Sequence, residues 1–304
     1  MLFKFNSKIR SILDSQRTRS QVRYDSQMML LGKLLCRSNR EARTLKSISD
    51  YEFKVFSQFG DDGIIQWLIH AIPVQHKTFI EFGVADYFES NTRFLLMNNN
   101  WSGLVLDGSS ANVERIRASH QMWRHELYAK AAFVTVDNVN QLVSDHPFGR
   151  EIGLLHIDVD GNDYWLWKAI ESVSPAIAII EYNSIFGCDR PITVPYQADF
   201  QRTRVHHSNL YYGVSLPALH DLATTKGYTL IGCNSAGNNA YFIRNDCRTD
   251  LIAGIGLSEA YVESKFREGR DKEGMLTYVS GKDRATAIRG LPVWNTRTHC
   301  TEPF

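Results

Sequence analysis

Two acidic residues stand at the ends of short apolar runs in the first half of the chain. Glu81 lies in the run 78–82 and is followed by Gly83, and Asp107 ends the run 103–106. After the first strand of an open parallel sheet, a glycine lets a ligand approach the backbone. An acidic residue at the tip of the second strand can accept both ribose hydroxyls of an adenosine group. The pattern predicts an adenosine cofactor site.

The loop that follows Gly83 distinguishes between cofactors. Residues 84–89 include Asp86 and Glu89 and lack the glycines of the Gly-x-Gly-x-x-Gly loop that wraps a pyrophosphate. Carboxylates repel phosphates and attract cations. S-adenosylmethionine carries a sulfonium and an ammonium group, so it fits this loop better than NAD or ATP.

The predicted cofactor contacts lie at the ends of four predicted strands and at one helix start, where free N–H groups are available. They are Glu81, Phe82, Gly83, Ser90, Asn91, Asp107, Gly108, Ser109, Asp137 and Asp158. Ser109 and Asp137 could lie beside the adenine. Asp137 equally fits the N-terminal cap of a helix.

A second acidic cluster follows the fourth predicted strand. Asp158 and Asp160 project from the same side of an extended chain, and the carboxyl edge of a parallel sheet faces the ligand crevice. Asp163 is expected to cap the helix that begins at Tyr164. The spacing excludes a calcium EF-hand, because Asp163 takes the place of its glycine and Ala169 that of its last glutamate.

The fifth predicted strand ends in further oxygen ligands. Glu181 and Asn183, together with Asp158 and Asp160, form a set suited to Mg²⁺ or Ca²⁺. Without a metal, methyl transfer to an alcohol needs a base. The catalytic candidates are Asp158, Asp160 and His207.

His206 and His207 lie in the long segment 183–213, which is rich in Arg and aromatic residues and could form a lid over the acceptor. An arginine nearby would lower the pKa of a histidine toward the useful neutral range. Exposed loop histidines without a role remain the alternative.

The bulk composition is that of an ordinary globular protein. The chain has 304 residues, 43% of them apolar and 22% charged, with a net charge of +1, so nucleic-acid binding by the whole protein is not expected. Residues 1–47 hold eleven Lys/Arg against three Asp/Glu. This basic arm could touch an acidic partner, an anionic membrane face or RNA, or be a solvated helical extension.

Targeting signals and cysteine pairs are absent from the sequence. No apolar run approaches the roughly 18–20 residues of a membrane span, and the N-terminus lacks the apolar core of a signal peptide. The five cysteines are scattered without a Cys-x-x-Cys pair, which argues against zinc and a disulfide framework. A cytoplasmic setting is expected, with a peripheral position at the inner membrane face as an option.

Strand and helix patterns alternate from residue 59 onward. Strands are expected at 78–82, 103–106, 131–136, 153–158 and 176–181, and helices near 64–72, 91–98, 110–119, 138–144, 163–171 and 215–226. The last two strands, 228–232 and 240–244, must form an antiparallel hairpin because few residues separate them.

This alternation predicts an α/β fold. Five parallel strands, a closing hairpin and helices on both faces make the Rossmann-like seven-stranded sheet of class I methyltransferases. We expect a basic helical extension at 1–50, the methyltransferase domain at 51–250 and a C-terminal extension at 251–304.

The chain resembles the FkbM-type S-adenosylmethionine-dependent methyltransferases and, more distantly, macrocin-type sugar O-methyltransferases. The resemblance covers roughly residues 57–245 and is carried by SQFGDDG at 57–63, FIEFG at 79–83 with SNT at 90–92, WSGLVLDGS at 101–109, HIDVDGNDY at 156–164, YYGVSL at 211–216 and GNNAYFI at 237–243. It implies methyl transfer to a hydroxyl of a sugar, glycan or glycosylated natural product. In macrocin-type relatives a divalent metal near the predicted acidic set orients the sugar hydroxyls.

Two other functions stay open at this point. An Asp-x-Asp at a strand tip also suits a glycosyltransferase that holds Mn²⁺ and a nucleotide sugar, although this leaves the acidic first loop unexplained. A non-catalytic binding or assembly protein on a methyltransferase fold is the other. The acceptor is expected to be a small molecule or glycan, and the apolar residues within 28–35 suggest self-association.

Overall fold

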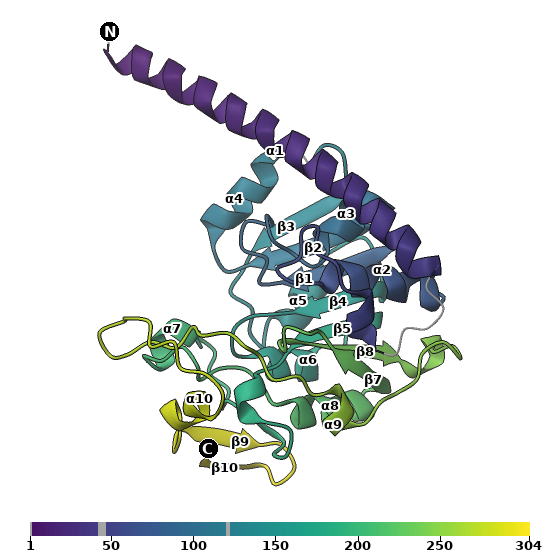
Figure 1. The fold of residues 1–304 in the computed structure, drawn as a ribbon, viewed down its shortest axis with the longest axis vertical. Coiled ribbons are helices and arrows are strands. Elements are labelled where there is room, and N and C mark those ends of the chain that lie inside the picture. The colour runs from purple at the N-terminus through teal and green to yellow at the C-terminus, as the bar shows by residue number, and fades with distance from the viewer. Residues whose placement is uncertain (1, 42–46, 120–121) are drawn as a thin grey trace.

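The computed structural model describes residues 2–41, 47–119 and 122–304, with residues 2–19 as backbone only. Its helices are α1 (Leu2–Glu41), α2 (Asp61–Ala71), α3 (Arg93–Asn99), α4 (Ser110–Ala118), α5 (Val139–Ser144), α6 (Asp163–Ala169), α7 (Arg202–Val205), α8 (Leu216–Thr225), α9 (Leu257–Ala260) and α10 (Lys282–Ala287). Short 3₁₀ turns lie at Ile48–Tyr51, Ser184–Phe186 and Asn245–Cys247. Figure 1 shows α1 running along the outside of the body, with its N-terminal half projecting beyond α4.

A central seven-stranded sheet holds the body together. It contains β1 (Thr78–Phe82), β2 (Ser102–Asp107), β3 (Leu127–Ala131), β4 (Glu151–Ile157), β5 (Ser174–Glu181), β7 (Tyr228–Cys233) and β8 (Asn239–Arg244) in the order β3-β2-β1-β4-β5-β8-β7. β1 to β5 pair in parallel, and β8 is antiparallel to both β5 and β7. This confirms the predicted Rossmann-like sheet with its closing hairpin.

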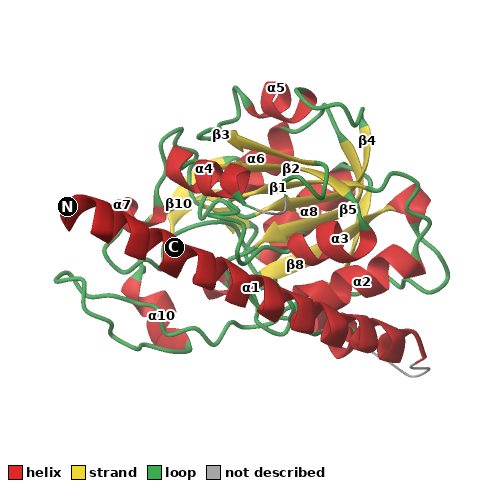
Figure 2. Cartoon of the chain, turned by 90° about the horizontal axis from the view of Figure 1, so that it is seen from above, coloured by secondary structure: helices red, strands yellow, loops and turns green. Residues whose placement is uncertain are grey.

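Helices cover both faces of this sheet (Figure 2) because side chains alternate along each strand. Phe79, Val105 and Leu154 pack with α2, α3 and α4 on one face. Ile80 and Leu155 pack with α5, α6 and α8 on the other. Strands buried on both sides are mostly apolar, as the sequence pattern indicated, with Glu81 and His156 as buried polar exceptions near their carboxyl ends.

The third strand differs from its predicted position. It covers Leu127–Ala131 rather than 131–136. β3 is an edge strand that pairs only with β2, and the ladder ends where Asp107 meets Ala131. Beyond this point the described residues offer no partner to extend the strand, so the mostly apolar residues 133–136 form a loop.

A second, three-stranded sheet was not predicted. It consists of β6 (Ile192–Thr193), β9 (Pro292–Asn295) and β10 (Cys300–Pro303) in the antiparallel order β10-β9-β6. β6 comes from the long segment 183–213, and the hairpin comes from the C-terminal extension. The two segments without periodicity therefore pair with each other.

Among the described helices, none combines the length and apolar character needed to cross a bilayer.

Candidate active site

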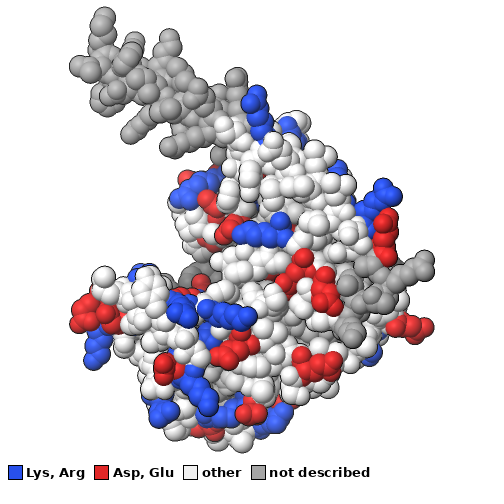
Figure 3. Space-filling model, viewed as in Figure 1, with Lys and Arg blue, Asp and Glu red and all other residues white. Residues whose placement is uncertain are grey.

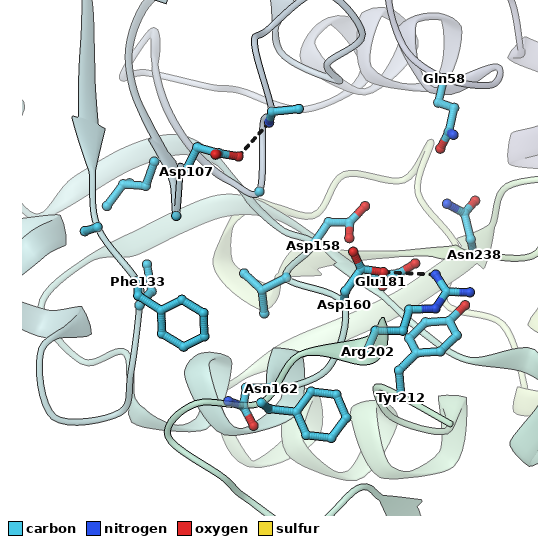
Figure 4. Close-up of a pocket in the computed structure, with 18 of the residues that line it drawn as sticks. Gln58, Asp107, Phe133, Asp158, Asp160, Asn162, Glu181, Arg202, Tyr212 and Asn238 are labelled. Carbon is cyan, nitrogen blue, oxygen red and sulfur yellow. Dashed lines mark hydrogen bonds and ion pairs between the residues drawn. The ribbon is translucent and has the colours of Figure 1, made fainter. Parts of the chain in front are cut away.

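A cavity of about 640 Å³ lies at the carboxyl ends of β1, β2, β4 and β5. The strand order reverses at β1 and β4, and such a switch point is where open α/β sheets bind ligands. Figure 4 shows side chains from several of these elements and from the segment 200–212 around the cavity. Figure 3 shows acidic and basic side chains interspersed over one face of the body, without one dominant charge.

Gly83 fixes the floor of this cavity. Its φ of +73° suits glycine, and a Cβ here would lie 1.7 Å from the carbonyl oxygen of Asp158. The ends of β1 and β4 therefore meet at a contact that only glycine permits. Gly83 was predicted to let a ligand approach the backbone. In the structure the group that approaches it is the carbonyl oxygen of Asp158 at the end of β4.

Asp107 ties two loops together at the tip of β2. Its Oδ2 accepts the Ala85 N–H at 2.8 Å, the contact drawn in Figure 4. Its Oδ1 accepts the Ser109 N–H at 2.8 Å and Nδ2 of Asn112 at 3.0 Å. The half-buried carboxylate lines the cavity and is held in one position by backbone amides.

One end of the cavity is apolar. Phe133 stands opposite Gly108, where a Cβ would lie 3.6 Å from the phenyl ring, and Leu106 and Val134 complete the wall. This arrangement suits a flat aromatic base. The sequence analysis missed Phe133 because it placed a strand over this loop.

Glu81 is buried, and its carboxylate is occupied by the protein itself. It accepts Oγ of Ser90 at 2.5 Å, the N–H groups of Asn91 and Thr92 at 2.9 and 3.1 Å, the hydroxyl of Thr92, and Nδ1 of His156 at 3.0 Å. Burial alone would raise the pKa of Glu81, but the bonds from His156 and the two hydroxyls lower it. For His156 the signs are reversed: burial alone would lower its pKa, but the hydrogen bond to Glu81 and the negative charge of Glu81 raise it. This ion pair anchors the loop before α3.

A smaller cavity of about 220 Å³ adjoins the first and is strongly polar. The two share Gly83, Asp158 and Asn238. The smaller one is also lined by Glu81, Glu89, Ser90 and Asn91, and by Asp61, which the sequence analysis did not select. Asp61 is buried and accepts hydrogen bonds from Asn234, Asn239 and Tyr241.

Three carboxyl groups meet at the ends of β4 and β5. Oxygen atoms of Asp158, Asp163 and Glu181 lie within 4.8 Å of one another, and Oε2 of Glu181 has no hydrogen-bond partner among the residues that the structure describes. Burial, followed by the charge of Asp160, raises the pKa of Asp158 to about 6. Burial and Asp158 raise the pKa of Asp163 to about 7, and burial with the neighbouring acids raises that of Glu181 well above its usual value. The trio therefore retains protons near neutral pH unless a cation enters.

The predicted metal set is not brought together. Asp160 has a φ of +56°, which turns it toward Nη1 of Arg202 at 2.9 Å and out of the trio. Asn183 is buried, with Oδ1 on the Ile185 N–H and Nδ2 on the carbonyls of Leu210 and Tyr212. Asp163 therefore takes the place of Asp160 and Asn183 in the carboxyl cluster.

Asp163 was expected to serve as a helix cap. Its two oxygens instead accept the N–H groups of Val159 and Gly161, each at 2.9 Å. These residues lie before α6, so the side chain folds back over its own loop toward Glu181.

Other predicted residues lie away from both cavities. His207 is exposed and packs on His206 with ring centroids 4.2 Å apart. Asp137 is exposed, and Ser109 caps α4 by accepting the Asn112 N–H at 3.4 Å. The side chain of Phe82 is fully buried in the core, so only its backbone remains for a ligand.

The far wall is built by the segment 183–213, which was expected to cover the acceptor, and by the C-terminal extension, for which no role was predicted. Arg202 donates to Asp160 and to the Asn209 carbonyl, the latter at 2.6 Å, and forms an ion pair with Glu268 at 2.6 Å. Its guanidinium lies 3.7 Å from the centroid of the Tyr212 ring. Phe266 stacks on Phe59 with centroids 5.0 Å apart. The C-terminal extension therefore contributes Phe266 and Glu268 to the cavity.

Comparisons with known proteins found matches among solved structures, all of them at low sequence identity. No protein-family model matches this sequence, and no curated protein matches it. Among solved structures, an O-methyltransferase from Bacillus cereus in complex with S-adenosylhomocysteine is 10% identical, covers 71% of this chain and 89% of its own, and has a TM-score of 0.40. The N-terminal domain of EvdMO1, solved in the presence of S-adenosylhomocysteine and D-fucose, is 12% identical over 60% of this chain and 80% of its own, with a TM-score of 0.39. The CurJ carbon methyltransferase is 9% identical over 66% and 57%, with a TM-score of 0.42.

Proposed function

We propose that this protein is an S-adenosylmethionine-dependent methyltransferase that acts on a hydroxyl group of an uncharged, sugar-like acceptor. The observation that carries the proposal is the acidic, two-part cavity at the switch point of the sheet, with an apolar slot at one end. Such a cavity suits a ligand with one flat base and two positive charges, which is the chemistry of S-adenosylmethionine.

Residues at the ends of β1 and β2 would bind the cofactor. Phe133 and Gly108 offer a slot for the adenine, and Asp107 a carboxylate for the ribose hydroxyls. The smaller cavity, with Asp61 and Asn91, would take the amino-acid end. Asp158 lines both cavities, so its carboxylate would face the positive sulfonium.

The acceptor would occupy the opposite side, near Glu181, Phe200 and Tyr212. Arg202 is the one Lys or Arg among the described residues that line the cavity, and it is already paired with Asp160 and Glu268. Among these lining residues no cation is left unpaired to bind a phosphate or carboxylate. This favours a neutral acceptor, because an anionic acceptor would need an unpaired Lys or Arg beside it.

Methyl transfer is an in-line displacement at the sulfonium carbon, so alignment and removal of one proton are the tasks left to the protein. The hydroxyl oxygen bonds to the methyl carbon as the carbon–sulfur bond breaks, and the hydroxyl proton moves to a carboxylate. Asp158, with its pKa of about 6, is best matched to this role at neutral pH. Asp160 and His207 are poorly placed for it, because one is paired with Arg202 and the other lies outside the cavity.

A divalent cation such as Mg²⁺ fits the acidic trio in charge and in donor type, and the unpartnered Oε2 of Glu181 is a free ligand. Asp158, Asp163 and Glu181 would hold it. When bound, the ion would supply a positive charge that orients the acceptor hydroxyl and eases loss of its proton.

Calorimetry with purified protein tests the cofactor assignment. We expect S-adenosylhomocysteine to bind and UDP not to bind, and we expect Asp107→Ala to weaken binding by about a hundredfold through loss of charged hydrogen bonds. Asp137→Ala is the matched control and should bind normally. Binding of UDP in place of S-adenosylhomocysteine would favour the glycosyltransferase alternative and overturn the proposal.

Tritium transfer from labelled S-adenosylmethionine tests the acceptor. We expect label in neutral glycans or sugars and none in phosphorylated ones. Cofactor binding without transfer to any fraction would instead point to the binding or assembly protein on this fold.

A further inference from the structure

The outer face of α1 carries large apolar side chains that the described part of the chain leaves uncovered. Their exposed fractions are 52% for Tyr24, 65% for Leu30, 54% for Leu31, 65% for Leu34 and 42% for Leu35. Isolated exposed leucines are ordinary, but five large apolar residues on one helix mark an interaction surface.

The opposite face of α1 is firmly docked on the body. A buried ion pair joins Asp25 to Arg93 at 2.7 Å. Gly32 lies so close that a Cβ would be 2.7 Å from Phe94 and Val55. The helix is therefore held in place, and its outward direction is set by the fold (Figures 1 and 2).

The loop after α4 extends this outer face. Trp123 is 74% exposed, and the guanidinium of Arg124 lies 4.7 Å from the centroid of its ring. Arg124 also lines a groove of about 320 Å³ together with Leu30 and Lys33 of α1. We call the following residues the α1 outer surface: Tyr24, Leu30, Leu31, Leu34, Leu35 and Trp123, together with the cations Arg23, Lys33, Arg37, Arg40 and Arg124. A tryptophan beside cations is typical of residues at a membrane–water interface.

The exposed charge on the α1 outer surface is positive. Arg23, Lys33, Arg37, Arg40 and Arg124 contribute cations. Among the described side chains of α1, Asp25 is buried against Arg93, and Glu41 pairs with Arg37 at 3.0 Å, so one of the two acids offsets one of these cations. In the sequence, residues 2–19 add five more Lys/Arg and a single Asp.

We propose that the α1 outer surface docks on an anionic lipid bilayer, with α1 lying in the interfacial plane. Apolar side chains enter the acyl boundary while the arginines and lysine contact lipid phosphates and carboxylates. A second copy of the chain would set these cations against one another, and a nucleic acid would leave the leucines exposed. A bilayer accommodates both features at once.

Sedimentation of the full chain with vesicles tests this proposal. We expect binding to vesicles of equal parts phosphatidylcholine and phosphatidylserine, little binding to pure phosphatidylcholine, and weakening in high salt. Replacing Arg23, Lys33 and Arg124 together by Glu should reduce partitioning by about a hundredfold or more, since each charge near the surface is worth roughly fivefold.

A second variant tests the apolar part. The double change Leu30→Ser and Leu34→Ser should also release the protein from anionic vesicles. Leu251→Ser and Lys272→Glu, on exposed positions elsewhere, are matched controls and should bind as the wild type does. Far-UV circular dichroism and thermal unfolding report the folded state of all variants, and neither measurement depends on a bound ligand.

Three outcomes would overturn the proposal. One is that the protein binds the anionic and the pure phosphatidylcholine vesicles equally well, or binds neither. Another is a dimer in light scattering that the leucine variant converts to a monomer, which would make a second copy the partner. The last is tight RNA binding that the leucine variant does not affect. Failure of the methyltransferase assignment would leave the vesicle result unchanged, so the two proposals are tested separately.

Discussion

The two ends of the cavity hold acidic groups in opposite ways. At the tip of β2, Asp107 accepts three hydrogen bonds, two from backbone N–H groups and one from the Asn112 side chain, so its position is fixed. At the tips of β4 and β5, Asp158, Asp163 and Glu181 crowd together, and Oε2 of Glu181 has no donor at all. The first end is organised before a ligand arrives, whereas the second needs protons or a cation to be stable.

This difference teaches how one sheet edge can serve two tasks. A carboxylate held in one position suits recognition of hydroxyl groups, because its acceptor oxygens are already oriented. A group of carboxyls with raised pKa values suits proton transfer or metal binding, because it changes its protonation near neutrality.

The largest effect is expected where the two ends touch. Gly83→Ala would place a methyl group 1.7 Å from the Asp158 carbonyl oxygen at a φ of +73°, so we expect β1 and β4 to separate and S-adenosylhomocysteine binding to be lost. Denaturant unfolding should show a loss of at least about 2 kcal/mol. Gly108→Ala, with its nearest neighbour 3.6 Å away, should change stability little. Normal binding by Gly83→Ala would contradict the close contact described above.

A smaller effect is expected from the charge of the acidic trio. Because the folded-state pKa values of Asp158 and Asp163 are raised to about 6 and 7, the folded protein holds more protons than the unfolded one above pH 4. The free energy of unfolding should therefore fall as the pH rises from 4 to 7.

Glu181→Gln isolates this contribution. It removes one buried acid whose pKa is raised, so the variant should lose less stability with rising pH and exceed the wild type at pH 8 by about 1–3 kcal/mol. Chemical unfolding at several pH values measures it, with the exposed Glu171→Gln as the control. If Mg²⁺ stabilises the wild type at pH 8 but not Glu181→Gln, the trio is a metal site. If the free energy of unfolding depended on pH identically in wild type and variant, Glu181 would not interact with Asp158 and Asp163 as described.

The smallest effect concerns Asp160. Its charge raises the pKa of Asp158, so Asp160→Asn should lower that pKa by less than about one unit while leaving cofactor binding intact. Carboxyl NMR titration can follow Asp158. Glu268→Gln, which removes the other partner of Arg202, is the comparison and should move the Asp158 pKa less. An unchanged titration in Asp160→Asn would show that the two carboxylates do not interact.

The positions of the residues at the tips of β1 and β2 could be predicted from the sequence, and those at the tips of β4 and β5 only in part. Gly83, Asp107 and Gly108 lie at or next to the ends of strands, and the strands can be predicted from their apolar runs. The position of Asp160 could not be predicted, because a positive φ at one residue turned its side chain away from Asp158. Phe133 was missed for a related reason, since the end of an edge strand depends on its partner.

The sequence by itself determined the order of strands and helices, the closing hairpin and the acidic character of the loops at the strand tips. These follow from local periodicity and from residue type, which do not depend on distant contacts. Only the tertiary structure decided which acids meet, that Arg202 is already neutralised, and that Phe266 and Glu268 of the C-terminal extension form a wall of the site. Those results depend on contacts between segments far apart in the chain, which leave no periodic signal in either segment.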